Sequence, residues 1–144
     1  MNQINGVHCI LELFGCPFGL LNDEGFIRET ISAAAVESGS TLISISSHQF
    51  SPQGVTALGL LAESHISIHT WPEVGYAAAD VFTCGSHCVP QQASQYLANT
   101  LQAGRHVLSV LNRGSQIPCN IKAFLKQKGG EDTCIRSIFN PPFG

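Results

Sequence analysis

The sequence is short of charge, and this shortage excludes some classes of protein. Only 12% of the 144 residues are charged, about half of the usual share of roughly 25%. Ten acidic and seven basic side chains give a formal net charge of −3, which argues against a nucleic-acid partner because phosphate binding needs a basic surface. A surface with so few charges predicts that one face is buried, for example in a subunit interface.

Long apolar runs and leader-like features are lacking as well. The sequence has no stretch of 18 or more apolar residues, so we expect no membrane span. The first residues lack the basic start and the apolar run of a signal peptide. Six cysteines in such a chain indicate reduced thiols in a cytoplasmic protein rather than a disulfide framework. The length predicts a single domain over residues 1–144.

The hydrophobic pattern predicts strands and two helices. Six segments have the alternation or the β-rich composition of strands: 6–14, 41–46, 55–62, 65–71, 77–83 and 105–111. Asn22 is predicted to cap a helix that ends near Gly39, and Pro90 is predicted to begin a helix that ends near Gly104.

Runs of strands divided by two helices predict an α+β fold. We expect a two-layer α/β sandwich, in which an antiparallel or mixed sheet carries the helices on one face. Nothing in the chain would cover the other face, so we expect a homodimer whose two sheets pack face to face. Residues 115–144 are interpreted as a peripheral tail with a helix, whose lysines form a solvated face, and a loose end.

The densest group of polar and aromatic residues lies at 63–73. Alternate side chains of a strand share a face, and one face here would carry His65, Ser67, His69 and Trp71. Two histidines suggest zinc, but four residues of strand place their backbones roughly 13 Å apart. The sequence therefore predicts no shared metal ion for His65 and His69.

The segment 84–88 is a second possible metal site, because it contains Cys84, His87 and Cys88. It offers at most three ligands, whereas a structural zinc site needs four, so we predict no metal and interpret Cys88 as an ordinary loop thiol. The other cysteines are interpreted as small apolar fillers or surface thiols: Cys9, Cys16, Cys119 and Cys134.

Ser64 and His69 could form a nucleophile and its base. Ser64 does not lie in the G-x-S-x-G turn of the α/β hydrolases. Judged from the residues alone, an ordinary strand serine is the simpler interpretation.

One long motif nevertheless stands out: Glu63-Ser64-His65-Ile66-Ser67-Ile68-His69-Thr70-Trp71-Pro72-Glu73, followed by Gly75-Tyr76-Ala77-Ala78 and by Asp80-Val81-Phe82-Thr83-Cys84-Gly85. Upstream of it lie His48-x-Phe50, Pro52-x-Gly54-Val55-Thr56 and Gly6-x-His8 with Glu12. Together these segments resemble a known family, the prokaryotic S-adenosylmethionine decarboxylase proenzymes, over roughly residues 6–112.

This resemblance implies an enzyme that makes its own pyruvoyl cofactor, with no metal. The Ser64 hydroxyl would attack the carbonyl of Glu63, and β-elimination would cut the chain into residues 1–63 (the β chain) and 64–144 (the α chain). The new terminus would become a pyruvoyl group, which forms a Schiff base with the substrate amine and accepts the electrons left by CO₂. The implied product is the aminopropyl donor for spermidine biosynthesis.

The same resemblance implies roles for individual residues. His69 would move protons during processing, and Cys84 would return a proton to the substrate carbon after decarboxylation. Thr56 stands where well-known members carry a serine that helps processing, and its extra methyl group could slow that step.

For the substrate, S-adenosylmethionine, the resemblance implies adenine stacking by Phe50 and Trp71 and ribose binding by Glu73. Phe50 and Trp71 could equally pack in the core or in a dimer interface, and Glu73 could be a surface acid beside a turn. His65 is interpreted as orienting the cleavage loop or satisfying a neighbour.

His8, Glu12 and Asp80 receive no role in the site, and Glu12 could belong to an interface salt bridge. Two alternatives to the implied activity remain. One is a pyruvoyl-dependent decarboxylase of another amino acid, such as ornithine or arginine. The other is a non-catalytic regulatory subunit, which the presence of both Ser64 and Cys84 disfavours.

Overall fold

The computed structural model describes residues 4–114, 121–131 and 133–138. Along the chain, the elements are β1 (Gly6–Phe14), α1 (Phe18–Leu21), α2 (Glu24–Glu37), β2 (Leu42–Gln49), β3 (Val55–Leu61), β4 (Ser64–Trp71), the 3-10 helix η1 (Pro72–Val74), β5 (Tyr76–Cys84), α3 (Pro90–Thr100), β6 (Arg105–Arg113), β7 (Ile121–Gln127) and β8 (Thr133–Ile138).

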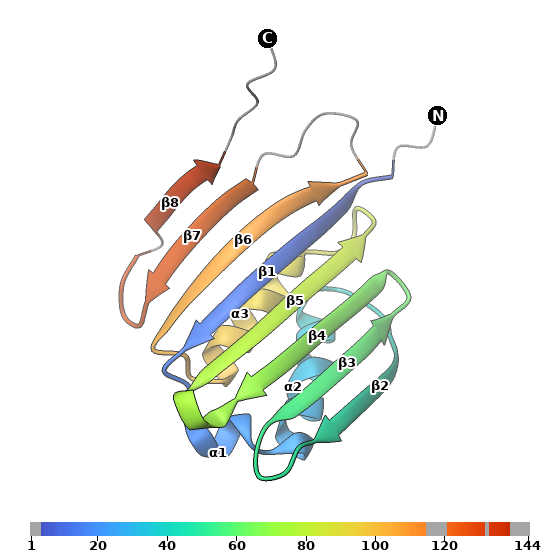
Figure 1. The fold of residues 1–144 in the computed structure, drawn as a ribbon. Coiled ribbons are helices and arrows are strands. Elements are labelled where there is room, and N and C mark those ends of the chain that lie inside the picture. The colour runs from blue at the N-terminus through green and yellow to red at the C-terminus, as the bar shows by residue number, and fades with distance from the viewer. Residues whose placement is uncertain (1–3, 115–120, 132, 139–144) are drawn as a thin grey trace.

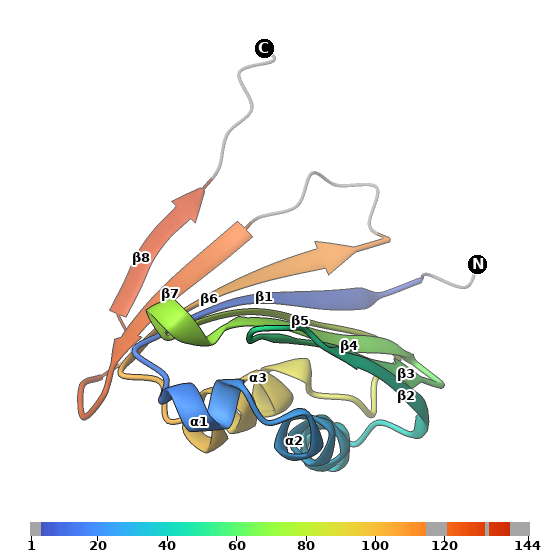
Figure 2. The same ribbon diagram turned by 60° about the horizontal axis from the view of Figure 1, so that its bottom comes forward.

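The described strands form one eight-stranded sheet in the order β2-β3-β4-β5-β1-β6-β7-β8, and every neighbouring pair is antiparallel (Figure 1). The helices lie on one face of the sheet, and no described helix covers the other face (Figure 2). The predicted α+β class and the placement of the helices on one face are therefore confirmed, with an antiparallel rather than a mixed sheet.

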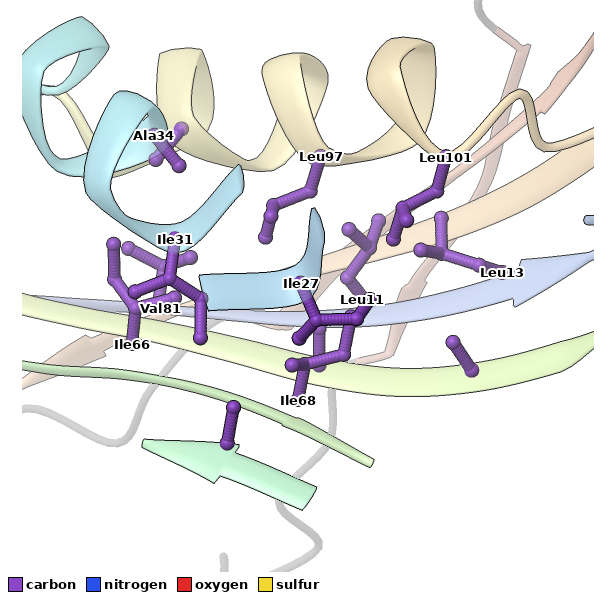
Figure 3. Close-up of a cluster of buried hydrophobic side chains, with 14 of the residues drawn as sticks. Leu11, Leu13, Ile27, Ile31, Ala34, Ile66, Ile68, Val81, Leu97 and Leu101 are labelled. Carbon is purple, nitrogen blue, oxygen red and sulfur yellow. The ribbon is translucent and has the colours of Figure 1, made fainter. Parts of the chain in front are cut away.

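The hydrophobic core lies between the sheet and the helices. Alternate side chains of β1, β4 and β5 point toward α2 and α3, as the period of two in a strand requires. Figure 3 shows this cluster, whose large members are fully buried: Leu11, Leu13, Ile27, Ile31, Ile66, Ile68, Val81, Leu97 and Leu101. The remaining side chains of these strands point to the opposite side.

We call this opposite side the open face. It carries polar residues of β1 and β4, such as His8 and His65, together with apolar side chains that the helices do not cover. Ile10, Leu58 and Leu60 are 38%, 47% and 49% exposed. The open face therefore combines a polar centre with apolar surface.

Two local predictions are wrong. Asp23 rather than Asn22 caps α2, because its Oδ1 accepts a hydrogen bond from the Phe26 N–H at 2.9 Å. Asn22 Oδ1 instead accepts hydrogen bonds from the Gly54 N–H and from Gln49 Nε2, both at 3.0 Å. Asn22 thus ties the start of α2 to the β2–β3 connection.

The predicted tail helix is also wrong, because residues 121–127 form β7. This strand pairs with β6, and β8 pairs with β7. A lysine spacing of four suits one face of a helix, but it also suits one face of a strand. The strand is favoured over the helix because the unpaired backbone N–H and C=O groups along the edge of β6 can form hydrogen bonds with it.

In the described part of the chain, no helix is long and apolar enough to cross a membrane.

Candidate active site

The predicted cleavage bond lies in the tight turn between β3 and β4. Leu61 pairs with Ser64, so that only two residues, Ala62 and Glu63, make the connection. Ser64 has a φ of 154°, which L residues rarely adopt, so the backbone at this bond is strained. The Glu63 carbonyl accepts a hydrogen bond from the Cys84 N–H at 3.0 Å.

Strand pairing brings Cys84 to this turn, although it lies twenty residues after Ser64 in the sequence. β5 pairs with β4, and Ser64 lies opposite Thr83, so Cys84 at the end of β5 lies beside the turn. The structure therefore brings together three of the predicted site residues: Glu63, Ser64 and Cys84.

The side chain of Glu63 anchors the same turn. Its Oε2 accepts a hydrogen bond from the Thr41 N–H at 2.9 Å, and its Oε1 lies 3.3 Å from His87 Nε2. The hydrogen bond from Thr41, assisted by the one from His87, holds the pKa of the Glu63 carboxyl below its usual value. Glu63 is thus a carboxylate that ties the turn to two other loops.

Thr56 and His69 form a second group. They are register partners on β3 and β4, and Thr56 Oγ1 lies 3.0 Å from His69 Nδ1. This contact joins the two residues for which the resemblance implies roles in processing. His69 lies five residues from Ser64 along β4, however, which separates their backbones by roughly 16 Å. The His69 side chain of one chain does not reach Ser64 of the same chain.

The predicted substrate residues lie at the His69 end of the sheet. Figure 1 shows the β2–β3 connection and η1 at the end opposite the β3–β4 turn. Trp71 ends β4, and its ring lies 5.3 Å from that of Tyr76. Phe50 follows β2, and Glu73 lies in η1. Trp71 and Phe50 are 43% and 48% exposed, which excludes packing in the core of this chain.

A polar cluster in the middle of the open face was not predicted. Asp80 Oδ2 lies 2.7 Å from His8 Nε2 and 2.7 Å from His65 Nε2, and the Ser67 hydroxyl donates to Oδ1. Burial alone would raise the pKa of Asp80, but the hydrogen bonds from Ser67, His65 and His8 outweigh it, and the pKa lies below its ordinary value. Asp80 is therefore a carboxylate shared by three donors.

Arg113 determines the tautomer of neutral His8 in this cluster. Its Nη1 donates to His8 Nδ1 at 3.1 Å, which leaves the ring proton of neutral His8 on Nε2, where it is donated to Asp80. Sequence reasoning could have grouped these residues, because His8, Asp80, His65 and Ser67 each occupy the polar positions of an alternating strand. It could not have shown that the three strands are neighbours.

Glu12 also lies on the open face, where the Tyr76 hydroxyl donates to its carboxylate. Burial and the adjoining Glu12 carboxylate raise the pKa of Tyr76 to about 12. The Tyr76 ring lies between those of Phe14 and Trp71, at 5.4 and 5.3 Å. Within this chain, Glu12 therefore helps to hold the aromatic group that contains Trp71.

The described cysteines divide into two kinds. Cys9 and Cys16 are buried, and burial raises the pKa of each thiol to about 11. They are apolar fillers, as predicted. Cys84 and Cys88 are partly exposed. Cys119 and the side chain of Cys134 lie outside the part of the chain that the structure describes.

Two groups of described side chains have the composition of a metal site. One is His8, His65 and Asp80, and the other is Glu63, His87 and Cys88. The first is organised as a hydrogen-bonded cluster, in which His8 Nε2 carries a proton rather than a free lone pair. The second group adjoins the β3–β4 turn.

Comparison with known proteins identifies relatives of this chain that match it over most of its length. The family model for S-adenosylmethionine decarboxylase matches residues 7–114. A protein of Synechococcus sp. (strain WH7803) named S-adenosylmethionine decarboxylase proenzyme is 59% identical over 103 residues, which cover 72% of this chain and 80% of the relative. A proenzyme of the same name from Methanococcus vannielii is 48% identical over 114 residues, covering 79% and 93%.

The fold has a solved counterpart. The crystal structure of the adenosylmethionine decarboxylase from Aquifex aeolicus VF5 superposes with a TM-score of 0.73 and 37% sequence identity, covering 81% of this chain and 97% of that chain. The matched residues 7–114 run from β1 to the end of β6 and contain the β3–β4 turn, Cys84 and the Thr56–His69 pair. By sequence and by fold, this chain belongs to the S-adenosylmethionine decarboxylase family of enzymes.

Proposed function

We propose that the chain is a self-processing, pyruvoyl-dependent decarboxylase, which converts S-adenosylmethionine to its decarboxylated form, the aminopropyl donor for spermidine biosynthesis. One observation carries the proposal. The Glu63–Ser64 bond lies in a strained turn, and the Glu63 carbonyl is already hydrogen-bonded by the Cys84 N–H. The relatives' name of proenzyme supports the same activity.

In the cleavage reaction, the Ser64 hydroxyl oxygen attacks the Glu63 carbonyl carbon. The carbonyl oxygen gains negative charge, and the Cys84 N–H at 3.0 Å stabilises it. The C–N bond then breaks, and an ester links the two halves. Loss of the Ser64 α-proton expels the new α-carboxylate of Glu63, and water releases ammonia from the remaining residue 64.

The residues present fit a pyruvoyl group at position 64. The turn supplies a hydroxyl and a carbonyl that accepts a hydrogen bond from the Cys84 N–H, and the end of β5 brings Cys84 beside the turn. When formed, the group supplies an electron sink for decarboxylation of an α-amino acid. Cys84 lies beside it and donates a proton to the substrate carbon once CO₂ has left.

His69 and Thr56 act from a second copy of the chain in this proposal. Within one chain, His69 and Ser64 are roughly 16 Å apart along β4. The proposed homodimer buries the two open faces against each other in the orientation that brings the partner's His69 to Ser64. The exposed Ile10, Leu58 and Leu60 supply apolar surface for such an interface. Thr56 orients the ring through Nδ1, so that Nε2 can move protons.

Phe50, Trp71 and Glu73 form the substrate side of the proposed site. The partly exposed rings of Phe50 and Trp71 can stack on adenine and tolerate the positive sulfonium. The Glu73 carboxylate can accept hydrogen bonds from the ribose hydroxyls. The relatives are named for S-adenosylmethionine, so no observation favours the ornithine or arginine alternative.

CO₂ release tests the substrate. The purified protein is incubated separately with S-adenosylmethionine, ornithine and arginine, and CO₂ is measured. We expect release from S-adenosylmethionine to exceed release from the other two by at least about 100-fold, because a site that hydrogen-bonds a substrate group rejects compounds that lack it. The Ser64→Ala chain serves as the blank. Faster release from ornithine or arginine would contradict the assignment.

Complementation between two inactive variants tests the shared site. Neither His69→Ala nor Ser64→Ala alone is expected to cleave. When the two are co-expressed in one dimer, the Ser64→Ala chain supplies an intact His69 to the intact Ser64 of the His69→Ala chain. Intact mass should then show that only the His69→Ala chain is cleaved. If His69 acted on Ser64 of its own chain, the mixture would stay uncut, and the shared site would be wrong.

A further inference from the structure

Three connections lie beside one another at this end of the sheet. The first joins α2 to β2, the second is the β3–β4 turn, and the third joins β5 to α3. The Val89 N–H donates to the Ser38 carbonyl at 2.9 Å, which joins the third loop to the first. Thr41 joins the first loop to Glu63. Side chains of the second and third loops are thereby held beside one another.

We propose that Glu63, His87 and Cys88 form a binding site for Zn²⁺ or a similar thiophilic divalent cation. Their ligand atoms all lie within 4.8 Å of one another, and Glu63 Oε1 lies 3.3 Å from His87 Nε2. Oxygen and nitrogen ligands of a tetrahedral zinc ion, each bound at about 2.0–2.1 Å, are about 3.3 Å apart. The oxygen and the nitrogen therefore already have the spacing of a zinc site.

The thiol needs only a small movement. A sulfur bound to zinc at about 2.3 Å lies about 3.6 Å from the other ligands. Because the ligand atoms now lie within 4.8 Å of one another, Cys88 Sγ has to approach by about 1.2 Å at most. The Cys88 Sγ is now held only by long contacts, at 3.7 Å to Ser40 Oγ and at 3.9 Å to the Gly39 carbonyl. On binding, the thiol loses its proton to solvent and becomes the thiolate ligand.

The burial of the three side chains suits an exchangeable ion. Glu63 is 10% exposed and is held by Thr41, whereas His87 is 62% exposed. The carboxylate is thus preorganised, and the imidazole can open to solvent as the ion enters. Three protein ligands leave a fourth position for water, as in open zinc sites rather than closed structural ones.

The His8, His65 and Asp80 group is less suited to a cation. Arg113 brings a positive charge to His8, and its hydrogen bond to Nδ1 leaves the proton on the nitrogen that faces Asp80. By contrast, the side-chain hydrogen bonds and ion pairs of Glu63, His87 and Cys88 within the described residues include no lysine or arginine. The site also differs from the one weighed in the sequence, because Glu63 from another loop takes the place of Cys84.

Binding is measured on the full, reduced chain, both unchanged and as Ser64→Ala. Because Ser64→Ala is not expected to cleave, the result does not depend on the proposed function. Zn²⁺ affinity is obtained by competition with a chromogenic chelator, and Co²⁺ is used to detect the thiolate-to-metal charge-transfer band. We expect one ion per chain with this band. Cys88→Ser should abolish the band and weaken Zn²⁺ binding at least tenfold, since even the loss of a supporting residue costs about 10–100-fold.

His87→Ala and Glu63→Gln should also weaken Zn²⁺ binding at least about tenfold. The matched controls are the other accessible or undescribed thiols, changed one at a time: Cys84→Ser, Cys119→Ser and Cys134→Ser. These should keep the band and the affinity. Absence of binding, unchanged affinity in Cys88→Ser, or loss of the band in a control would each overturn the proposal. Circular dichroism of each variant shows that a loss of binding is not a loss of fold.

Discussion

The Ser64→Ala chain is expected to remain a single polypeptide of 144 residues, whereas the unchanged chain separates into residues 1–63 and 64–144. The physical reason is that both halves of the proposed reaction use the same oxygen. The Ser64 oxygen first attacks the Glu63 carbonyl carbon. In the elimination it leaves the Cβ of residue 64 as part of the new Glu63 carboxylate, and alanine has no oxygen for either step. Cleavage should therefore be lost completely rather than slowed.

Intact mass after prolonged incubation measures this result. The 64–144 piece of the unchanged chain should lack a free N-terminal amine, because residue 64 has lost its nitrogen as ammonia. A matched control is Ser44→Ala, which removes a hydroxyl from an exposed position of β2 and should leave cleavage unchanged. An unchanged chain that never separates would refute self-processing, and a Ser64→Ala chain that still separates would refute the cleavage position.

Cys84→Ala has a different expected result, because the residue contributes two groups. Its backbone N–H stabilises the charge on the Glu63 carbonyl oxygen, and alanine keeps that N–H. Its thiol is proposed to donate a proton to the substrate carbon, and alanine removes it. We therefore expect normal separation into two chains together with CO₂ release from S-adenosylmethionine that is lower by about 10²–10⁴-fold, the usual contribution of a positioned acid.

Mass spectrometry and CO₂ release on the same sample separate the two effects. Cys119→Ala is the matched control, because it removes a thiol outside the matched residues 7–114 and leaves Cys84 and Cys88 in place. It should retain decarboxylation. Full CO₂ release by Cys84→Ala would show that another group returns the proton, and failure of Cys84→Ala to cleave would show that the thiol, and not only the N–H, takes part in processing.

The local pattern of the sequence was sufficient to predict the core strands and which of their side chains are buried. Alternation at 6–14 and 65–71 predicts which side chains of β1 and β4 face the helices, and Leu11, Ile66 and Ile68 are fully buried there. This works because the side-chain period of a strand is set by its own backbone. The motif around Ser64 likewise predicted the family, since residues 63–85 are nearly continuous in the chain.

The geometry of the candidate site was only partly predictable. The pairing of Thr56 with His69 depends on the register of the β3–β4 hairpin, which a two-residue turn determines locally. The distance of roughly 16 Å between His69 and Ser64 also follows once β4 is a strand. The contact between Glu63 and Cys84 requires in addition that β5 pairs with β4.

By itself, the sequence determined the family, the alternation of the strands and the candidate residues Ser64, His69 and Cys84. Only the tertiary structure decided that β1 lies between β5 and β6, that residues 121–127 extend the sheet, and that His8, Asp80 and His65 share one cluster. The reason is that side-chain periodicity is a property of a single segment. Strand order is instead decided by backbone hydrogen bonds and burial between segments far apart in the chain, which leave no local pattern in the sequence.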